Sequence, residues 1–327
     1  MAYYLTEADV RQVLTMGVAL EAVEHAMKSL AAAKAVDMPR QRTRLPTGNL
    51  NILQGAAPEL GVVGYKAYYA PKLSDTARHR HVYLYDTASG ALSAIIEADF
   101  LGMMRTGAAS GLATRYLSRE ESAQVGLFGA GWQARGQLEA LCAVRNIGKA
   151  KVFSRNSEKL QNFCRSMSEE LEIDAVPAES AEAAARGSDI VTTITRAASP
   201  VFRGEWVEAG QHINAVGSNT LTRREIDADT VRKCDIVVVD SRDIAKNESG
   251  DLLPLVEGGY LHWETLVELK DAVAGRAPLR TSPMQITLFE SHGMAVQDLF
   301  VAARVLLAAR ERGLGVKLPI GGQISRL

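Results

Sequence analysis

A glycine pattern at residues 129–134 is typical of a loop that binds a phosphate group. Gly129, Gly131 and Ala134 give the spacing G-x-G-x-x-A, after an apolar run and before a segment with helical character. The first glycine permits a tight turn, the second lets a pyrophosphate approach the backbone, and the alanine lets helix and strand pack closely. The helix would then offer N–H groups and the positive end of its dipole. The pattern predicts a dinucleotide site, whereas the simpler alternative is a set of glycines that only turn the chain.

The segment Ser154-Arg155-Asn156 indicates which dinucleotide this loop binds. An NAD site usually has an acidic residue at the end of the second strand, where its carboxylate binds the ribose hydroxyls. Here the next carboxylate is that of Glu158. Arginine can stack on adenine and pair with a 2′-phosphate, to which serine can also donate. We therefore expect NADP(H) in preference to NAD(H), unless Arg155 is only a solvated surface charge.

The elements that position these residues alternate between strand and helix. A helix is expected over 103–117, and apolar strands over 124–128, 151–154, 189–195, 212–216, 235–240 and 286–289, with helical stretches between several of them. Continuous apolar strands of this kind fit a parallel sheet that is covered on both faces.

The first hundred residues follow a different pattern. Thr6 and Asp9 resemble a helix N-cap, and helical periodicity continues to about Lys34. Short β-type segments follow at 49–55, 62–70 and 81–96, the last as a hairpin around residues 86–90. They predict helices on a small, mostly antiparallel sheet, to which the apolar helix expected at 295–313 would return.

The composition argues against several classes of partner. Lys and Arg number 37 and Asp and Glu 38, without a block of like charge, so a nucleic-acid surface is not expected. The longest apolar run, 299–309, contains Arg304 and is too short to span a bilayer. Three widely spaced cysteines favour a reducing, cytoplasmic compartment. His79 and His81 have no evident third ligand, so no metal is expected.

Four segments resemble the ornithine cyclodeaminase/mu-crystallin family. They are RTGAASGLATRYL (105–117), GLFGAGWQARGQ (126–137), AVGSNTLTRREID (215–227) and SHGMAVQDL (291–299). The resemblance covers nearly the whole chain and implies an α/β fold. A Rossmann dinucleotide-binding domain would occupy residues 118–297. An α/β substrate-binding and dimerisation domain would be built from both chain ends, 1–117 and 298–327, and the protein would be a homodimer.

The resemblance also implies the residues of the site. The family binds an α-carboxylate with two arginines and a lysine, which Arg42, Lys66 and Arg105 match, with Arg40 and Arg44 as nearby alternatives. Arg105 is expected near a helix start, where the dipole favours an anion. Partial burial of Lys66 would lower its pKa and suit it to proton transfer. Cofactor contacts are expected from Thr106, Gly129, Ala130, Gly131, Trp132, Gln133, Ala134, Ser154, Arg155, Asn156, Thr195, Val216, Gly217, Ser218, Gly293 and Met294.

Asn219 departs from the family pattern. Cyclodeaminases have an Asp there, which anchors the distal ammonium of ornithine, and an amide supplies neither charge nor useful basicity. We therefore expect NADPH-dependent reduction of a small α-imino acid, with cyclic ketimines such as Δ1-pyrroline-2-carboxylate or Δ1-piperideine-2-carboxylate as substrates. The alternatives are an ornithine cyclodeaminase, an alanine-type amino-acid dehydrogenase and a non-catalytic NADPH-dependent binding protein. His292 either relays a proton or fills space.

Overall fold

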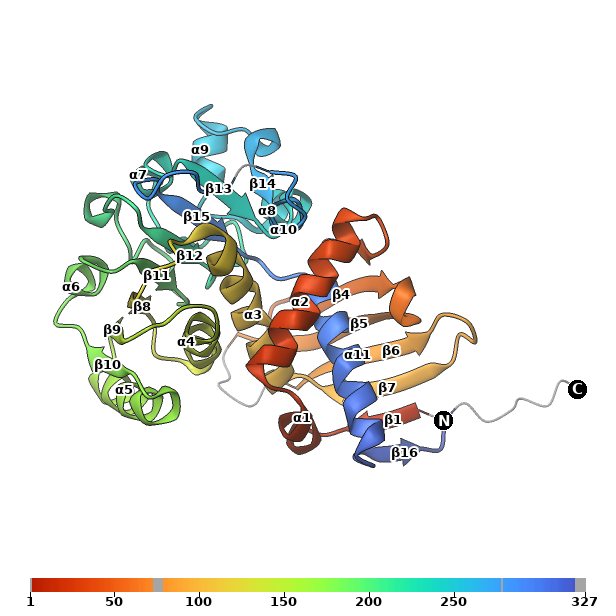
Figure 1. The fold of residues 1–327 in the computed structure, drawn as a ribbon. Coiled ribbons are helices and arrows are strands. Elements are labelled where there is room, and N and C mark those ends of the chain that lie inside the picture. The colour runs from red at the N-terminus through yellow and green to blue at the C-terminus, as the bar shows by residue number, and fades with distance from the viewer. Residues whose placement is uncertain (1, 73–78, 278, 321–327) are drawn as a thin grey trace, which may run out of the picture. The chain divides into compact units, whose positions relative to one another are not determined.

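The chain forms two compact units, which the computed structural model describes over residues 2–72, 79–277 and 279–320 (Figure 1). Unit 1 comprises Met1–Arg105 and Met294–Leu327, and unit 2 comprises Thr106–Gly293. Helix α3 (Asp99–Leu117) therefore contributes residues to both units. The domain boundaries implied by the resemblance, after residue 117 and before residue 298, stay a prediction. Among the described residues, no helix has both the length and the apolar composition that crossing a membrane requires.

Unit 1 contains an eight-stranded sheet whose strand order is β16-β1-β7-β6-β5-β4-β2, with β3 also paired to β4. The strands are β1 (Ala2–Leu5), β2 (Val36–Asp37), β3 (Gln41–Leu45), β4 (Gly48–Ala57), β5 (Val62–Pro71), β6 (Arg80–Asp86), β7 (Leu92–Glu97) and β16 (Val316–Leu318). All pairs are antiparallel except β1 with β7. The mostly antiparallel sheet and the hairpin of β6 and β7 confirm the prediction.

The helices of unit 1 cover one face of this sheet (Figure 1). The expected N-cap is confirmed, since Thr6 and Asp9 form a reciprocal capping box on α1 (Glu7–Val13). The helical stretch expected to about Lys34 forms two helices, because the chain breaks after Val13 and Thr15 caps α2 (Met16–Ala31). Helix α11 (Ala295–Glu311) packs on β4, β5 and α2, so the C-terminal helix does return to the N-terminal part.

Unit 2 contains a parallel sheet with the order β10-β9-β8-β11-β12-β15-β13-β14. The strands are β8 (Gln124–Phe128), β9 (Lys149–Phe153), β10 (Asp174–Pro177), β11 (Ile190–Thr193), β12 (His212–Ala215), β13 (Ile236–Val239), β14 (Val267–Glu268) and β15 (Thr287–Glu290). The six predicted strands are present; β10 and β14 were missed because they are short and not continuously apolar. The order reverses at β8, whose neighbours are β9 and β11, as in Rossmann folds, which bind ligands at that point.

Helices surround this sheet and cover its core (Figure 1). They are α4 (Trp132–Val144), α5 (Ser157–Leu171), α6 (Ala181–Ala185), α7 (Ala228–Arg232), α8 (Arg242–Glu248), α9 (Leu253–Glu257) and α10 (Leu269–Val273). One apolar cluster joins β8 and β9 to α4 and α5, through Leu127, Val152, Leu138 and Phe163. A second cluster includes Phe128, Ile213 and Leu288. The fold is therefore α/β, with a Rossmann domain and a second α/β domain built from both chain ends.

Candidate active site

The glycine loop leads from β8 into α4 at the point where the strand order reverses. Gly129 has a φ of 118°, and a Cβ there would lie 2.6 Å from the carbonyl oxygen of Ile194, just after β11. Only glycine therefore fits this turn. The loop lies at the carboxyl ends of β8 and β11, where a Rossmann fold binds its ligand.

The second glycine keeps one side of the loop open. A Cβ built on Gly131 would meet no atom within 4 Å, although this residue caps α4. Ala134 is fully buried against the sheet, as close helix packing requires. An open backbone at the start of a 13-residue helix suits a pyrophosphate, so the loop fits a dinucleotide. Trp132 beside it is 40% exposed.

The residues expected at the adenosine phosphate follow β9. Ser154 is half-buried and Arg155 is exposed. The side chain of Asn156 accepts a hydrogen bond of 2.8 Å from Lys159 N and so caps α5. The side-chain oxygen of Asn156 is therefore already bonded to the helix, and Ser154 and Arg155 are the side chains best suited to binding a phosphate.

Glu225, for which the sequence predicts no role, joins two loops that are expected to contact the cofactor. Its buried carboxylate accepts hydrogen bonds from Thr195 Oγ1 (2.6 Å), just after β11, and from Gly217 N (2.6 Å), just after β12. Burial raises the pKa of Glu225, and the hydrogen bonds from Thr195 and Gly217 oppose that shift. Val216 and Ser218 flank Gly217, so this carboxylate fixes the backbone that carries them.

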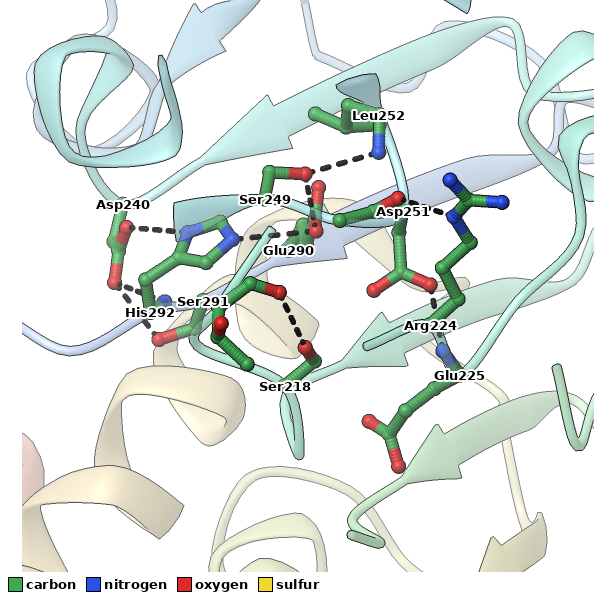
Figure 2. A network of polar contacts seen from close by, with 12 residues as sticks. Ser218, Arg224, Glu225, Asp240, Ser249, Asp251, Leu252, Glu290, Ser291 and His292 are labelled. Atoms are coloured by element: carbon green, nitrogen blue, oxygen red, sulfur yellow. Dashed lines mark hydrogen bonds and ion pairs between the residues drawn. The ribbon is translucent and has the colours of Figure 1, made fainter. Parts of the chain in front are cut away.

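His292 lies between two carboxylates in unit 2 (Figure 2). Its Nε2 is 3.2 Å from Glu290 Oε1, and its Nδ1 is 3.6 Å from Asp240 Oδ1. Asp240 Oδ2 also accepts hydrogen bonds from Ser291 Oγ and from the backbone N–H groups of His292 and Gly293. The side chain and backbone of this segment are thus held by the same acid.

The electrostatics of this cluster keep the imidazole charged. Burial lowers the pKa of His292, but Glu290 and Asp240 together raise it to about 10. Asp240 has a lowered pKa, because its hydrogen bonds from His292, Gly293 and Ser291 outweigh burial. A buried imidazolium with a pKa far above neutral is a poor proton relay. The geometry instead supports a structural role. From the sequence alone, a structural role and a proton relay are equally good interpretations of His292.

A second acid lies close to Glu290 in the same network (Figure 2). Ser249 Oγ donates to Glu290 Oε1 at 2.7 Å and accepts from Leu252 N at 2.9 Å. Burial and the charge of Glu290 raise the pKa of Asp251 to about 8. Asp251 accepts from the backbone N–H of Glu225 at 2.7 Å, so the network continues to the loop that carries Glu225.

Other expected residues lie elsewhere in their units. Asn219 is half-buried in the loop after β12, and Thr106 lies on α3. Met294 is the N-cap residue of α11.

In unit 1, Arg42 and Lys66 share one face of the sheet. Arg42 on β3 is paired with Asn51 on β4, and Lys66 on β5 is paired with Leu53 on β4. Directly paired residues share a face, as do residues two apart along a strand, so all four side chains point the same way. Arg42 Nε donates to Asn51 Oδ1 at 3.2 Å. Of the alternatives, Arg44 is exposed on β3 and Arg40 lies just before that strand.

Asp298 on α11 brings Lys66 and Arg105 together. Its Oδ1 accepts from Lys66 Nζ at 2.8 Å and from Arg105 Nε at 3.0 Å. Arg105 Nη1 also donates to Gln297 Oε1 at 3.2 Å. All four residues are buried. Two cations therefore share one carboxylate, and the cluster has an excess of positive charge that an anionic ligand would balance.

This environment lowers the pKa of Lys66 to about 7. Burial is the largest cause and the charge of Arg105 the next, while Asp298 acts in the opposite direction. An amine that titrates near neutral pH is suited to giving and taking protons.

Arg105 does not lie at a helix start, which corrects the sequence-based expectation. Helix α3 begins at Asp99, because the Glu7 carboxylate accepts from Asp99 N at 2.6 Å and from Phe100 N at 3.0 Å. Arg105 is in the second turn, so its attraction for an anion comes from its own guanidinium. The cap was missed because Glu7 lies far away in the sequence.

Asp298 and Gln297 were also missed as functional residues. Both fall in the quoted segment SHGMAVQDL, where no role was assigned to them. The available signal was their polarity within a helix that is otherwise apolar on its buried face.

Known proteins resemble this chain over most of its length or nearly all of it. A Δ1-pyrroline-2-carboxylate reductase of Bacillus cereus is 37% identical over 238 residues, which are 72% of this chain and 73% of the relative. The structure of Thermococcus litoralis Δ1-pyrroline-2-carboxylate reductase in complex with NADH and L-proline matches with a TM-score of 0.93 and 35% identity, over 97% of this chain and 100% of that chain.

An archaeal alanine dehydrogenase dimer with bound NAD matches with a TM-score of 0.92 and 31% identity, over 98% of this chain and 99% of that chain. The sequence profile of one family matches residues 2–312, which include the glycine loop and both charged clusters. On this evidence the chain belongs to the ornithine cyclodeaminase/mu-crystallin family.

Proposed function

We propose that this protein, an NAD(P)-dependent oxidoreductase, reduces small cyclic α-imino acids, with Δ1-pyrroline-2-carboxylate and its six-membered analogue as substrates and proline or pipecolate as products. The main support for this proposal is the buried cluster in which Asp298 holds Lys66 and Arg105 side by side. It combines an excess of positive charge with an amine that titrates near neutral pH. The relatives that act on Δ1-pyrroline-2-carboxylate support the substrate class.

The cations of the cluster would bind the substrate carboxylate. The guanidinium of Arg105 offers a planar pair of donors, and Arg42 is on the same sheet face as Lys66. Removing a charged partner of this kind costs about 1.5–3 kcal/mol of binding.

Lys66 would supply the proton. Protonated Lys66 Nζ gives a proton to the imine nitrogen, which makes the adjacent carbon a better hydride acceptor, and solvent later restores that proton. A lowered pKa makes this transfer easier than from an ordinary lysine. Bound NAD(P)H supplies the hydride that reduces the α-carbon.

Asn219 favours a substrate without a distal ammonium group. A cyclodeaminase must anchor that ammonium and oxidise the α-amine, and an uncharged amide is a poor anchor. A ready-made cyclic imine has no such group. We therefore propose that ornithine is not a substrate.

For the cofactor, we propose NADPH in preference to NADH. The support is local: Ser154 and Arg155 follow β9, without an acidic residue before Glu158. The relatives above contain NADH or NAD, so this preference would distinguish the chain from them. Ser154→Asp should reverse the preference, because its carboxylate would bind the ribose hydroxyls and repel a 2′-phosphate. Comparison of kcat/KM for NADPH and NADH in both proteins is the measurement; an unmodified enzyme that favours NADH contradicts the argument.

A homodimer in the cytoplasm is part of the proposal. One similar protein is a dimer. The sheet face of unit 1 turned away from Lys66 carries a stacked aromatic pair, Tyr65 and Tyr83, whose ring centroids are 4.7 Å apart, and Val63 beside them is 41% exposed. An apolar face of this kind suits a second copy. The three cysteines are free, as in a reducing compartment.

The reaction is tested by following NADPH oxidation with four substrates. Δ1-Pyrroline-2-carboxylate and Δ1-piperideine-2-carboxylate should be reduced fastest, pyruvate with ammonia slowly, and ornithine should release no ammonia. Faster turnover of pyruvate with ammonia would replace the proposal with an alanine-type dehydrogenase. Tight NADPH binding without turnover of any substrate would indicate a binding protein instead.

A further inference from the structure

Gln297 and Asp298 each use one polar atom and leave another unused. Gln297 Oε1 accepts from Arg105, and Asp298 Oδ1 accepts from both Lys66 and Arg105. Gln297 Nε2 and Asp298 Oδ2 have no hydrogen-bond partner among the residues that the structure describes. Both side chains belong to residues that are 0% exposed. A buried donor and a buried anionic acceptor, on adjacent residues, thus remain unsatisfied.

Such groups usually have a partner, because leaving a buried donor or acceptor unpaired is costly. The two unused atoms define what that partner must offer. Gln297 Nε2 needs an acceptor, and Asp298 Oδ2 needs a donor, preferably a cationic one. Both belong to the cluster whose net positive charge already favours a carboxylate.

A protonated α-imino or α-amino acid offers this combination. Its carboxylate accepts hydrogen bonds, its N–H group donates one and is positively charged, and a single carbon joins the two. A 2-oxo acid or a 2-hydroxy acid ether has the same carboxylate but presents only an acceptor where the nitrogen would be. That acceptor would face the Asp298 carboxylate and be repelled.

We propose that Asp298 Oδ2 binds the substrate N–H group and that Gln297 Nε2 donates to the substrate carboxylate, so that this pair selects nitrogen-bearing acids. The inference rests on the proposed function and adds a specificity determinant to it. Asp298 then has two roles, because the oxygen that orients Lys66 and Arg105 is not the one that recognises the substrate. The proton that Lys66 delivers to the imine nitrogen would then be shared with Asp298, whose other oxygen lies 2.8 Å from Lys66 Nζ. An N–H held by a carboxylate stays protonated more readily, which favours hydride addition to the imine carbon.

The experiment compares two ligands that differ only in the atom concerned. L-Proline carries a ring N–H group, and (S)-tetrahydro-2-furoate has a ring oxygen in its place. Calorimetric titration into enzyme saturated with NADPH gives both dissociation constants without turnover, because neither ligand accepts a hydride. The proteins are the unmodified enzyme, Asp298→Asn, Gln297→Leu and Glu311→Gln. The last is the control for Asp298→Asn, because it also replaces a carboxylate by an amide, but at an exposed position of the same helix.

The unmodified enzyme and Glu311→Gln should bind proline roughly ten- to a hundredfold more tightly than the furoate, the ratio expected for one charged hydrogen bond. Asp298→Asn should abolish that ratio, whereas Gln297→Leu should weaken both ligands by a similar factor and preserve it. The ratio cancels any general loosening of Lys66 and Arg105.

Equal affinity of the unmodified enzyme for both ligands would overturn the inference, even if Asp298→Asn failed to fold. A ratio that survives Asp298→Asn would overturn it as well, while leaving imine reduction intact. Failure of the unmodified enzyme to bind either ligand, together with no reduction of cyclic imines, would overturn the proposed function and this inference with it.

Discussion

The cluster around Lys66 in unit 1 and the cluster around His292 in unit 2 are built from similar groups but carry opposite charge balances. At Lys66, two cations share the single carboxylate of Asp298. At His292, one imidazole lies between the carboxylates of Asp240 and Glu290. The pKa of the lysine is lowered to about 7, and that of the histidine is raised to about 10.

This difference indicates that the Lys66 cluster is suited to binding a ligand, whereas the His292 cluster is suited to stabilising the fold. A buried cluster with excess positive charge is unfavourable until an anion arrives, so it is suited to capturing a carboxylate. At His292 the proton that the protein itself retains offsets one of the two carboxylate charges, and Asp240 holds the backbone of residues 291–293, so this cluster acts within the protein. Burial and perturbed pKa values alone do not distinguish the two, because both clusters have them.

The largest effect is expected from Lys66→Met. Methionine keeps a similar length without an ionisable group, so kcat for imine reduction should fall by about 10²–10⁴, the usual contribution of a positioned proton donor. The melting temperature should be unchanged or higher, because a poorly solvated amine is removed while Arg105 still pairs with Asp298. Steady-state kinetics and calorimetry measure the two quantities. A variant that retains its rate would remove Lys66 from the chemistry.

His292→Gln should show the reverse pattern. Two buried carboxylates would lose their shared cation, which should lower the free energy of unfolding by about 3–5 kcal/mol. The folded enzyme should keep its kcat within about tenfold, since losing a true proton relay costs more than that. Urea denaturation and kinetics at low temperature provide the test. A stable variant with a rate loss like that of Lys66→Met would make His292 part of the chemistry instead.

The two clusters also differ in how far the sequence predicts them. Lys66, Arg105 and His292 are found because they lie in motifs that resemble those of a family. Asp298 is not, because its role comes from contacts with residues 232 and 193 positions away. Glu225 is missed for the same reason, as its partner Thr195 is 30 positions away. The residues that supply charge are evident in the sequence, but those that orient them become evident only after folding.

The helices and strands show the same difference between what local sequence determines and what depends on distant residues. The strands of unit 2 were predicted because each central strand is a continuous apolar run, which reflects burial on both faces. The start of α3 was not, because its cap is the Glu7 side chain of another helix. The break between α1 and α2 depends on a local cap at Thr15, a signal that the sequence contains but that continuous helical periodicity obscured.

The smallest expected effect is the pH dependence of stability in the unmodified protein, because its two clusters act in opposite directions. The folded pKa of His292, about 10, lies above the ordinary value of 6.5, so its stabilisation is complete below pH 6.5 and is lost as pH rises through 10. The folded pKa of Lys66, about 7, lies below its ordinary value of 10.5, so its destabilising effect is complete below pH 7 and disappears as pH rises to 10.5. Between those limits each group changes the free energy of unfolding by about 1.4 kcal/mol per pH unit, in opposite directions. In the unmodified protein the two contributions largely cancel.

The free energy of unfolding of Lys66→Met should therefore fall with pH relative to the unmodified protein between pH 7 and 9.5, and that of His292→Gln should rise. The difference between each variant's unfolding curve and that of the unmodified protein reports on the cluster that contains the substitution. Parallel curves for all three would mean that neither cluster holds its proton as its charge balance requires.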